Sequence, residues 1–420
     1  MLARAIAINH RLFGSTDLSP ERVLKLVMWP LAVVTGLTVV FNKALAGDVT
    51  NDFTPVYKAA VAFLHHGPVY DENLETVDPH YLYSPGGTMI LSPLGLFGEI
   101  EARQLFILAN AIAIVFATYF LLRVFGFGLR TVAAPICYFA IFISEPVVNT
   151  LTFGNINGFI FLAEALYINF LISRRDLWAG VVLGLTIVTK PTLAPLLLIA
   201  AARRQWSTIF SAISVPILIT AVAWPLSADP VSYFQRNLPY SLEIRDYFNS
   251  SISGIALYYG VSSPVAMAAR LLLAIVTAAT LWLLFRYYVN DDVFFVCTAA
   301  GVIMTAEFIL ASLGQQYYSI YIYPLIMTVV MSQSLIRNWP AWLAIFGFVS
   351  YDKWLLYRSP SLGRDLEYLR VPFGWSLLLI VVFCVLSDRY LTARREGRLR
   401  QGIDSFNVAP DLSPLKSSRR

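Results

Sequence analysis

The chain of 420 residues carries far fewer charged side chains than a soluble protein of its length. Only 14% of its residues are charged, against about a quarter in an ordinary soluble domain, while 57% are hydrophobic and the mean hydropathy is +0.65. This composition excludes a soluble enzyme, a disordered chain and a nucleic-acid-binding protein. It predicts an all-α polytopic membrane protein, in which the net charge of +5 reports orientation rather than a ligand.

The chain begins with a polar, basic segment, 1–25, and continues with apolar runs. We expect the first run to be an uncleaved anchor, although Ala44-Leu45-Ala46 resembles a cleavage site. The twelve runs that predict membrane crossings fall at 26–45, 103–123, 131–148, 156–172, 178–189, 191–202, 207–225, 263–286, 293–313, 317–335, 340–356 and 373–392.

The segment 82–98 is an additional apolar stretch that is too short and too rich in Pro and Gly for a regular span. We expect a broken or re-entrant helix there, which gives about 12–13 transmembrane or re-entrant helices in all. The sequence leaves open whether 82–98 or 178–202 fully crosses the membrane.

Basic residues predict the orientation of the chain. Short loops that contain arginine are expected in the cytoplasm, as is the polar tail 394–420, which we expect to be disordered. Both termini are then cytoplasmic, and the long loops 46–85 and 226–262 lie outside. The segment 53–66 places Val56, Ala59, Ala60, Phe63 and Leu64 on one helical face, which is typical of a helix at the membrane interface.

Cysteine and histidine do not predict a metal site. Cys137, Cys297 and Cys384 each lie within an apolar run, where core packing is the expected role. His65 and His66 are adjacent, so that on a helix their rings point about 100° apart and form a poor pair of ligands. No zinc-protease, serine-hydrolase or phosphate-loop motif is present.

The first outer loop and the ends of several spans contain the residues that can carry chemistry. Asp52 follows the first span directly. A carboxylate there can be a helix cap, but its place at the bilayer surface beside a broken helix favours a functional role. Lys190 lies between two short apolar pieces, where it can either reach lipid head groups or bind a phosphate in a cavity.

Amide, carboxylate and aromatic side chains in the outer loops are candidates for contacts with a polyhydroxyl ligand, although tyrosines are also typical of membrane interfaces. Asn155 and Asn157 can either cap a helix or contact a sugar. Glu145, Glu164 and Glu307 fall within apolar runs and are functional candidates without an assigned role. The candidate residues for acceptor or sugar binding are Tyr57, Tyr81, Tyr83, Asn155, Asn157, Asp246, Asn249, Gln316 and Tyr317.

Several stretches in the same order along the chain resemble a known family. The first outer loop, Asn51-Asp52-Phe53-x-Pro55-Val56-Tyr57, is similar to that of the membrane-embedded GT-C glycosyltransferases, and more closely to that of glycosyltransferase family 87. Within that family the chain resembles the C-type arabinofuranosyltransferases of mycobacteria and corynebacteria. The matching stretches are Val77–Tyr83 with Pro85–Thr88, Asn155–Gly158, Arg245–Ser251, Ile336–Leu343 and Gly374–Ile380.

The resemblance implies a GT-C fold over 26–393 and transfer of arabinofuranose from decaprenyl-phosphoryl arabinose to the arabinan of arabinogalactan and lipoarabinomannan. It implies an α-1,3 branch made with inversion on the outer face of the plasma membrane. The family motif presents two adjacent acids, and here Asn51 replaces the first. We therefore expect Asp52 to be the single general base, with no cofactor and with any need for a divalent metal left open.

The leaving group in such a reaction is a lipid phosphate, which needs a cation as its charge develops. We expect Lys190 and Arg245 to supply that charge, with His80 behind them. The lipid chain would lie in a groove between helices, with the broken helix 82–98 at its mouth. Three alternatives stay open at this point: a mannosyltransferase or other pentosyltransferase on the same fold, a transporter or flippase for a polyprenyl-linked sugar, and a scaffold subunit.

Overall fold

The protein is described by a computed structural model that covers residues 19–47 and 52–400, and in these ranges it contains helices and no strand. The first half contains α2 (Pro20–Leu37) with its continuation η1 (Thr38–Leu45), α3 (Phe53–Leu64), α4 (Pro85–Leu91), η2 (Ser92–Leu96), α5 (Glu99–Val124), α6 (Ala133–Ile143), α7 (Glu145–Thr152), α8 (Asn157–Ile172), α9 (Asp176–Thr189), η3 (Pro191–Leu196) and α10 (Leu197–Ala202). The second half contains α11 (Trp206–Ala223), η4 (Trp224–Leu226), η5 (Tyr233–Asn237), α12 (Leu238–Leu242), α13 (Ile252–Tyr258), α14 (Ser263–Tyr287), α15 (Asp292–Leu310), η6 (Gln316–Ile322), α16 (Tyr323–Met327), η7 (Thr328–Val330), α17 (Trp339–Val349), α18 (Pro360–Arg395) and η8 (Arg398–Arg400).

The all-α, polytopic membrane class expected from the sequence is confirmed. Among the described residues, six helices are long and apolar enough to cross a membrane, or up to seven if the bent pair α6 and α7 forms one span. The six are Pro20–Leu45, Glu99–Val124, Trp206–Leu226, Ser263–Tyr287, Asp292–Leu310 and Pro360–Arg395. Four other expected crossings correspond to the shorter apolar helices Asn157–Ile172, Asp176–Thr189, Pro191–Ala202 and Trp339–Val349.

The expected crossing at 317–335 is wrong as a regular helix. That stretch consists of the short pieces η6, α16 and η7. Pro324 cannot donate a backbone hydrogen bond, and the buried Ser319 hydroxyl accepts one from the Trp375 indole at 3.0 Å. An irregular backbone of this kind is tolerated at membrane depth only where protein surrounds it, and η6 is buried throughout except at Gln316.

Three spans differ clearly in length from their expected bounds. The helix expected at 340–356 ends at Val349. Beyond it, the Arg370 guanidinium donates hydrogen bonds to the carbonyls of Gly347 and Ser350, at 3.1 and 2.7 Å. The last span begins at Pro360 instead of 373, so most of the expected outer loop 357–372 is helical. The first span likewise begins earlier, at Pro20, with Ser19 capping it.

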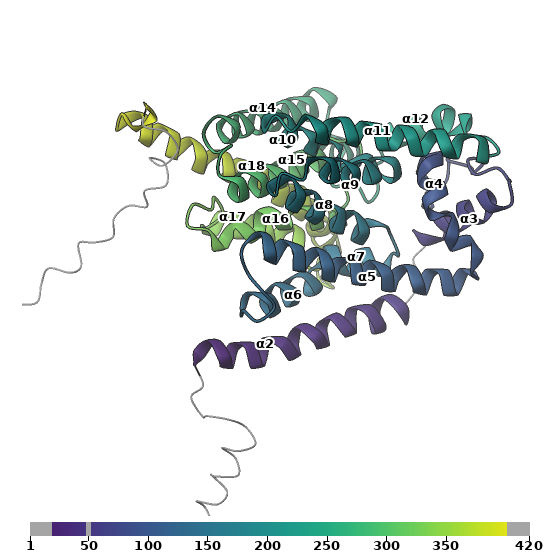
Figure 1. The fold of residues 1–420 in the computed structure, drawn as a ribbon, viewed down its shortest axis with the longest axis horizontal. Helices are drawn as coiled ribbons and strands as arrows, with labels where there is room; N and C mark the ends of the chain where they lie inside the picture. Colours follow the sequence, from purple (N-terminus) through teal and green to yellow (C-terminus); the bar gives the residue numbers. More distant parts are fainter. Residues whose placement is uncertain (1–18, 48–51, 401–420) are drawn as a thin grey trace, which may run out of the picture.

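The segment 82–98 is a broken helix, as expected, made of α4 and η2. α3 precedes it and buries Phe53, Val56, Ala59, Ala60 and Phe63, while Leu64 is only partly buried. Figure 1 shows α3, α4 and α12 gathered at one end of the molecule, whereas the end of α18 and the start of α2 lie at the other end.

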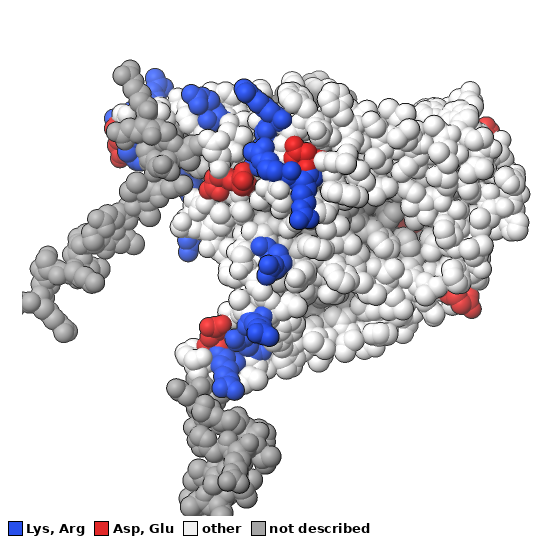
Figure 2. All heavy atoms as spheres, viewed as in Figure 1, with Lys and Arg blue, Asp and Glu red and all other residues white. Residues whose placement is uncertain are grey.

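On one face of the molecule, basic side chains lie away from the end that holds α3 and α4. On the face drawn in Figure 2, Lys and Arg lie from the end that holds the start of α2 and the last turns of α18 to the middle of the face, and the opposite end shows only a few acidic groups. Lys25 donates to the Arg130 carbonyl at 3.1 Å, which places the start of α2 beside the loop after α5. The structure describes the expected tail 394–420 only as far as residue 400, and it describes the segment 1–25 only from residue 19 onward.

Candidate active site

Asp52 lies directly before α3 and faces other polar groups instead of capping the helix. Its side chain makes no capping hydrogen bond. Burial raises the pKa of Asp52 to about 6, and the Lys190 ammonium and a polar contact with Asn155 partly offset that rise. A carboxylate with this pKa is largely ionised at pH 7 and is still basic enough to accept a proton, which suits a general base. The neighbouring Asn51 lies outside the described residues.

Lys190 lies between α9 and η3, and its ammonium points into the protein. The residue is extended, with φ −146° and ψ 108°, because a proline follows it. Nζ donates to Asn157 Oδ1 at 3.1 Å and lies 4.1 Å from the centre of the Tyr318 ring. It also interacts electrostatically with Asp52 and Glu307. The ammonium is therefore held within a polar cluster and does not extend to lipid head groups.

The turn between α7 and α8 brings Asn155 to Asp52. Gly154 ends α7 with φ +63°, a conformation that favours glycine, and the Asn155 amide N–H donates back to the Thr150 carbonyl at 3.2 Å. The Asn155 side-chain oxygen accepts from the Asn157 backbone N–H at 3.2 Å. Asn155 therefore supports the start of α8 and also contacts the Asp52 carboxylate, and its contact with a sugar stays a prediction.

The broken helix brings Tyr83 to the same place. Ser84 caps α4 and also donates to the Val188 carbonyl at 2.5 Å, next to the end of α9. A Cβ at Gly87 would lie 2.9 Å from that same carbonyl oxygen, so the close approach of α4 to α9 requires glycine there. Tyr83 precedes α4, and its hydroxyl interacts electrostatically with the Asp52 carboxylate.

Tyrosines of η6 form the other wall of the site. The Tyr321 hydroxyl donates to Asn157 Oδ1 at 2.7 Å, the same oxygen that accepts from Lys190. Tyr317 lies 5.8 Å from the Lys190 ammonium, and its hydroxyl donates to Gln315. We call the set that these contacts join the Asp52–Lys190 cluster: Asp52, Tyr83, Asn155, Asn157, Lys190, Glu307, Tyr317, Tyr318 and Tyr321.

Arg245 lies at the margin of the cluster. Its guanidinium stands 5.3 Å from the Tyr240 ring and 5.9 Å from the Tyr247 ring, and it interacts electrostatically with Tyr318. Its Nε is buried without a hydrogen-bond partner among the described residues. Arg245 is therefore a second cation, besides Lys190, that acts on Tyr318.

His80 is a candidate that the structure does not bring into the cluster. Its Nε2 lies 3.1 Å from the Thr76 carbonyl oxygen, its Nδ1 lies 3.6 Å from Glu72, and its ring packs edge-on against Tyr240. These contacts hold the loop 72–80 against the segment that carries Arg245. His80 therefore supports the outer loops instead of facing Lys190.

Tyr57 and Tyr81 also serve the packing of the first outer loop. The Tyr57 hydroxyl donates to the Phe97 carbonyl at 3.0 Å, and the buried Tyr81 hydroxyl donates to Thr88 at 2.8 Å. Asn237 of η5 donates to the Tyr81 carbonyl at 2.7 Å, so the two long outer loops are joined directly.

Three further candidates lie in the later outer loops. The buried Asn249 amide bonds four backbone groups, at Arg245, Ser251, Ser312 and Gly314, at 2.8 to 3.0 Å. Gln316 bonds the Phe348 and Ser350 carbonyls and the Arg370 guanidinium. Asp246 is exposed. The hydrogen-bonding capacity of Asn249 and Gln316 is used within the protein, which favours structural roles.

Two members of the cluster, Tyr318 and Tyr321, were not predicted from the sequence, and Glu307 was noted only as an acid within an apolar run. The spacing of Tyr317, Tyr318 and Tyr321 resembles an ordinary core stripe, so the sequence offers little signal. The described residues contain no group of three or more His, Cys, Asp or Glu side chains that could hold a metal ion.

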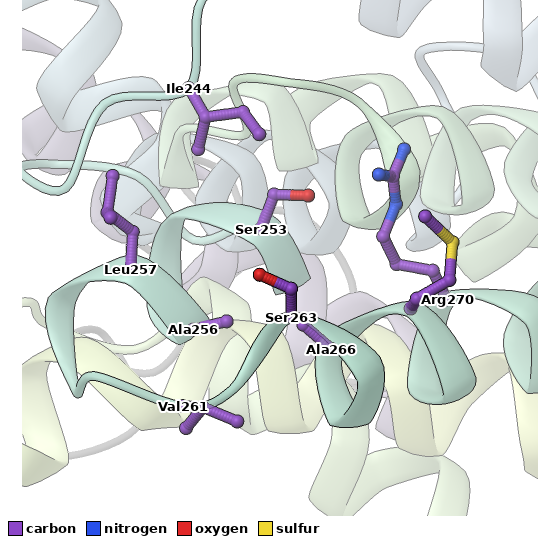
Figure 3. A pocket seen from close by; sticks show the side chains of 9 residues that line it. Ile244, Ser253, Ala256, Leu257, Val261, Ser263, Ala266 and Arg270 are labelled. Atoms are coloured by element: carbon purple, nitrogen blue, oxygen red, sulfur yellow. The ribbon is translucent and has the colours of Figure 1, made fainter.

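An apolar groove of about 250 Å³ opens between α13 and α14 (Figure 3). Its lining is mainly aliphatic and includes Ile244, the residue before Arg245. Two hydroxyl side chains, Ser253 and Ser263, and the Arg270 guanidinium are its polar groups. Arg270 donates to the Leu310 carbonyl at 2.8 Å, so the groove ends against the last turn of α15, the helix that carries Glu307.

Comparison with known proteins gives one family and one named activity. The model of glycosyltransferase family 87 matches residues 81–312. The chain is 44% identical over 400 residues to an alpha-(1->3)-arabinofuranosyltransferase of Mycolicibacterium smegmatis, covering 94% of this chain and 93% of that protein. A protein with the same name from Mycobacterium tuberculosis is 45% identical over 397 residues, covering 94% of this chain and 92% of that protein. One from Corynebacterium glutamicum is 38% identical over 358 residues, covering 85% of this chain and 86% of that protein. No solved structure matches the chain significantly.

Proposed function

Because this chain belongs to glycosyltransferase family 87, we propose that the Asp52–Lys190 cluster is the active site of an inverting arabinofuranosyltransferase that uses a polyprenyl-phosphate sugar. The proposed donor is decaprenyl-phosphoryl arabinose, and the proposed acceptor is the α-1,5-linked arabinan of the cell wall. The product is an α-1,3 branch, in line with the name of the relatives. The observation that carries the proposal is a buried carboxylate, Asp52, that interacts with the inward-pointing Lys190 ammonium and with Asn155.

The arrangement fits a single displacement. The acceptor hydroxyl oxygen attacks C1 of the arabinofuranose while the bond from C1 to the phosphate oxygen breaks, and the β-linked donor gives an α-linked product. The hydroxyl proton passes to the Asp52 carboxylate. The electron pair of the broken bond leaves on the phosphate, where Lys190 and Arg245 stabilise the charge.

Polar contacts around these groups suit a furanose and its acceptor. Tyr83, Asn155 and Tyr317 border the carboxylate and present hydroxyl and amide groups. The apolar groove of Figure 3 gives the lipid chain of the donor a surface that begins next to Arg245. This differs from our expectation of a mouth at 82–98, where α4 packs closely against α9.

We propose that the cluster faces the outside of the plasma membrane and that both termini are cytoplasmic. The basic side chains of Figure 2 lie away from the end that holds α3 and α4, and cytoplasmic loops are enriched in Lys and Arg. Donor lipid and nascent arabinan would then meet at the outer surface.

The test is a transfer assay with purified protein, a panel of polyprenyl-phosphate sugars and an α-1,5-arabinan oligomer, followed by determination of the product linkage. Formation of an α-1,3-arabinofuranosyl branch supports the proposal. Transfer of mannose instead would reject the donor but keep the mechanism, and no transfer from any donor would reject the assignment in favour of a transporter or scaffold. The Asp52→Asn variant is the control for enzyme-dependent transfer.

A further inference from the structure

A buried arginine near the start of α5, Arg103, donates its hydrogen bonds to two other helices. Its Nη1 donates to the Ala44 carbonyl at 3.2 Å, and its Nη2 donates to the Thr152 carbonyl at 3.1 Å. The residue is 8% exposed, and its Nε has no hydrogen-bond partner among the residues that the structure describes. Burying a guanidinium costs free energy unless its N–H groups are bonded, so these two carbonyls are what keeps it in place.

Both carbonyls belong to the end of a helix. Ala44 lies in the last turn of η1, and Thr152 is the last residue of α7. The last carbonyls of a helix have no partner within that helix, and a cation beside them also offsets the negative end of the helix dipole. Arg103 therefore caps two helices with one side chain. A guanidinium can do so because its two amino groups point apart in one plane, whereas a lysine ammonium is a single point charge.

The two capped helices lead to two groups of the Asp52–Lys190 cluster. From η1 the chain continues to Asp52 and α3, and from α7 it continues into the turn that carries Asn155. The Asn155 side chain contacts the Asp52 carboxylate. α5 packs against η1, α3, α7 and α8 (Figure 1), so Arg103 joins the two segments on which that contact depends.

The next turn of α5 holds the same two segments together by packing. The Phe106 ring lies 5.3 Å from the ring of Phe53, the first residue of α3, and 5.6 Å from the ring of Phe159 in α8. The segments also touch each other, because a Cβ at Gly154 would lie 3.2 Å from the Phe53 Cβ. Arg103 and Phe106 are three residues apart and share one face of α5, which thus supports both sides of the contact.

We propose that Arg103 is a positioning residue for sugar transfer. By capping η1 and α7 together, it fixes the Asp52 carboxylate relative to Asn155 and so directs the base toward the acceptor hydroxyl. The inference rests on the proposed function for its catalytic meaning, but the joint between the two helix ends does not. A misplacement of about 1 Å can lower the rate of an enzyme by about 10²-fold, so a loosened joint is expected to act on the chemical step.

Hydrogen exchange tests the joint without a substrate. The experiment follows the backbone N–H groups of 153–155, which close the end of α7, by mass spectrometry of the purified full chain in detergent. Arg103→Gln is expected to raise their exchange rate several-fold, and so is Arg103→Lys, which keeps the charge but cannot cap both helices. Arg389→Gln is the matched control, because Arg389 also donates to two backbone carbonyls, those of Gln333 and Ser334, at 2.7 and 3.1 Å. It should leave exchange at 153–155 unchanged, and wild-type exchange in both Arg103 variants would overturn the proposal.

Transfer kinetics test the catalytic meaning. Per folded molecule, Arg103→Gln is expected to lower kcat by about 10²-fold, while the donor KM stays close to that of wild type, because Lys190 and Arg245 remain to bind the phosphate. A merely structural role would lower the melting temperature and leave kcat unchanged, which is the result expected for Arg389→Gln. Arg103→Lys keeps the buried charge and serves the same tests if Arg103→Gln does not fold.

The two arms separate the joint from the proposed function. Faster exchange at 153–155 together with wild-type kcat in the Arg103 variants would reject the positioning role and leave the proposed function standing. Faster exchange in variants of a chain whose wild-type form transfers no sugar would support the joint and reject the proposed function. Wild-type kcat and exchange in Arg103→Lys would overturn the two-helix cap, since a single ammonium would then suffice.

Discussion

The acid side of the pH profile depends on Asp52 and gives the most quantitative test of the site. A pKa of about 6 means that Asp52 is ionised in about 90% of molecules at pH 7 and in about 10% at pH 5. An ordinary aspartate, with a pKa of 3.8, would still be about 94% ionised at pH 5. If ionised Asp52 is the base, kcat/KM for the donor must fall roughly ninefold between pH 7 and pH 5, whereas an ordinary aspartate would leave it almost constant.

The assay measures kcat/KM for the lipid donor at closely spaced pH values, with thermal melting of the same samples as a check on folding. Asp52→Asn should lower the rate at pH 7 by about 10²- to 10⁴-fold. It should not lower thermal stability at that pH, because burial disfavours the ionised carboxylate in the folded protein. A flat profile from pH 7 to pH 5, or full activity of Asp52→Asn, would refute the role of Asp52 as the base.

Two further predictions concern Lys190 and Asn249. Lys190→Ala should raise the donor KM more than the acceptor KM, because it removes the ammonium that faces the leaving phosphate, and an unchanged donor KM would contradict that role. Asn249→Ala should destabilise the folded protein by about 2 kcal/mol or more, since it leaves buried backbone groups near Gly314 unpaired, and melting in detergent measures the loss. A melting temperature equal to that of wild type would show that these groups find other partners; the exposed Asp246→Ala is the control and should melt as wild type does.

Local patterns explain why much of the fold was predictable. Hydropathy identified the long spans, and proline and glycine identified the break at 82–98, because both signals act over one or two turns of chain. For the stretch 317–335, the same reasoning wrongly predicted a regular helix. Its apolar residues are typical of a span, but contacts from Trp375 and Asn157, far away in the sequence, stabilise an irregular backbone there.

Some candidate residues from the sequence lie in the Asp52–Lys190 cluster, and others have structural roles. Asp52, Lys190, Asn155 and Asn157 were identified because a charged or amide group beside an apolar run is unusual. Asn249 and Gln316 belong to the same residue classes, yet their amides bond the backbone of other loops. Residue type and position along the chain do not reveal where a side chain's hydrogen bonds go.

The sequence by itself determined the membrane class, the helical architecture and a short set of polar residues in the outer loops. Composition and the position of charged residues between apolar runs can be read from the sequence without knowledge of tertiary contacts. Only the tertiary structure decided that the Lys190 ammonium turns inward and that Asn155 reaches Asp52. The physical reason is that electrostatic contacts depend on distance in space. Helix packing sets those distances, and the order of residues along the chain does not.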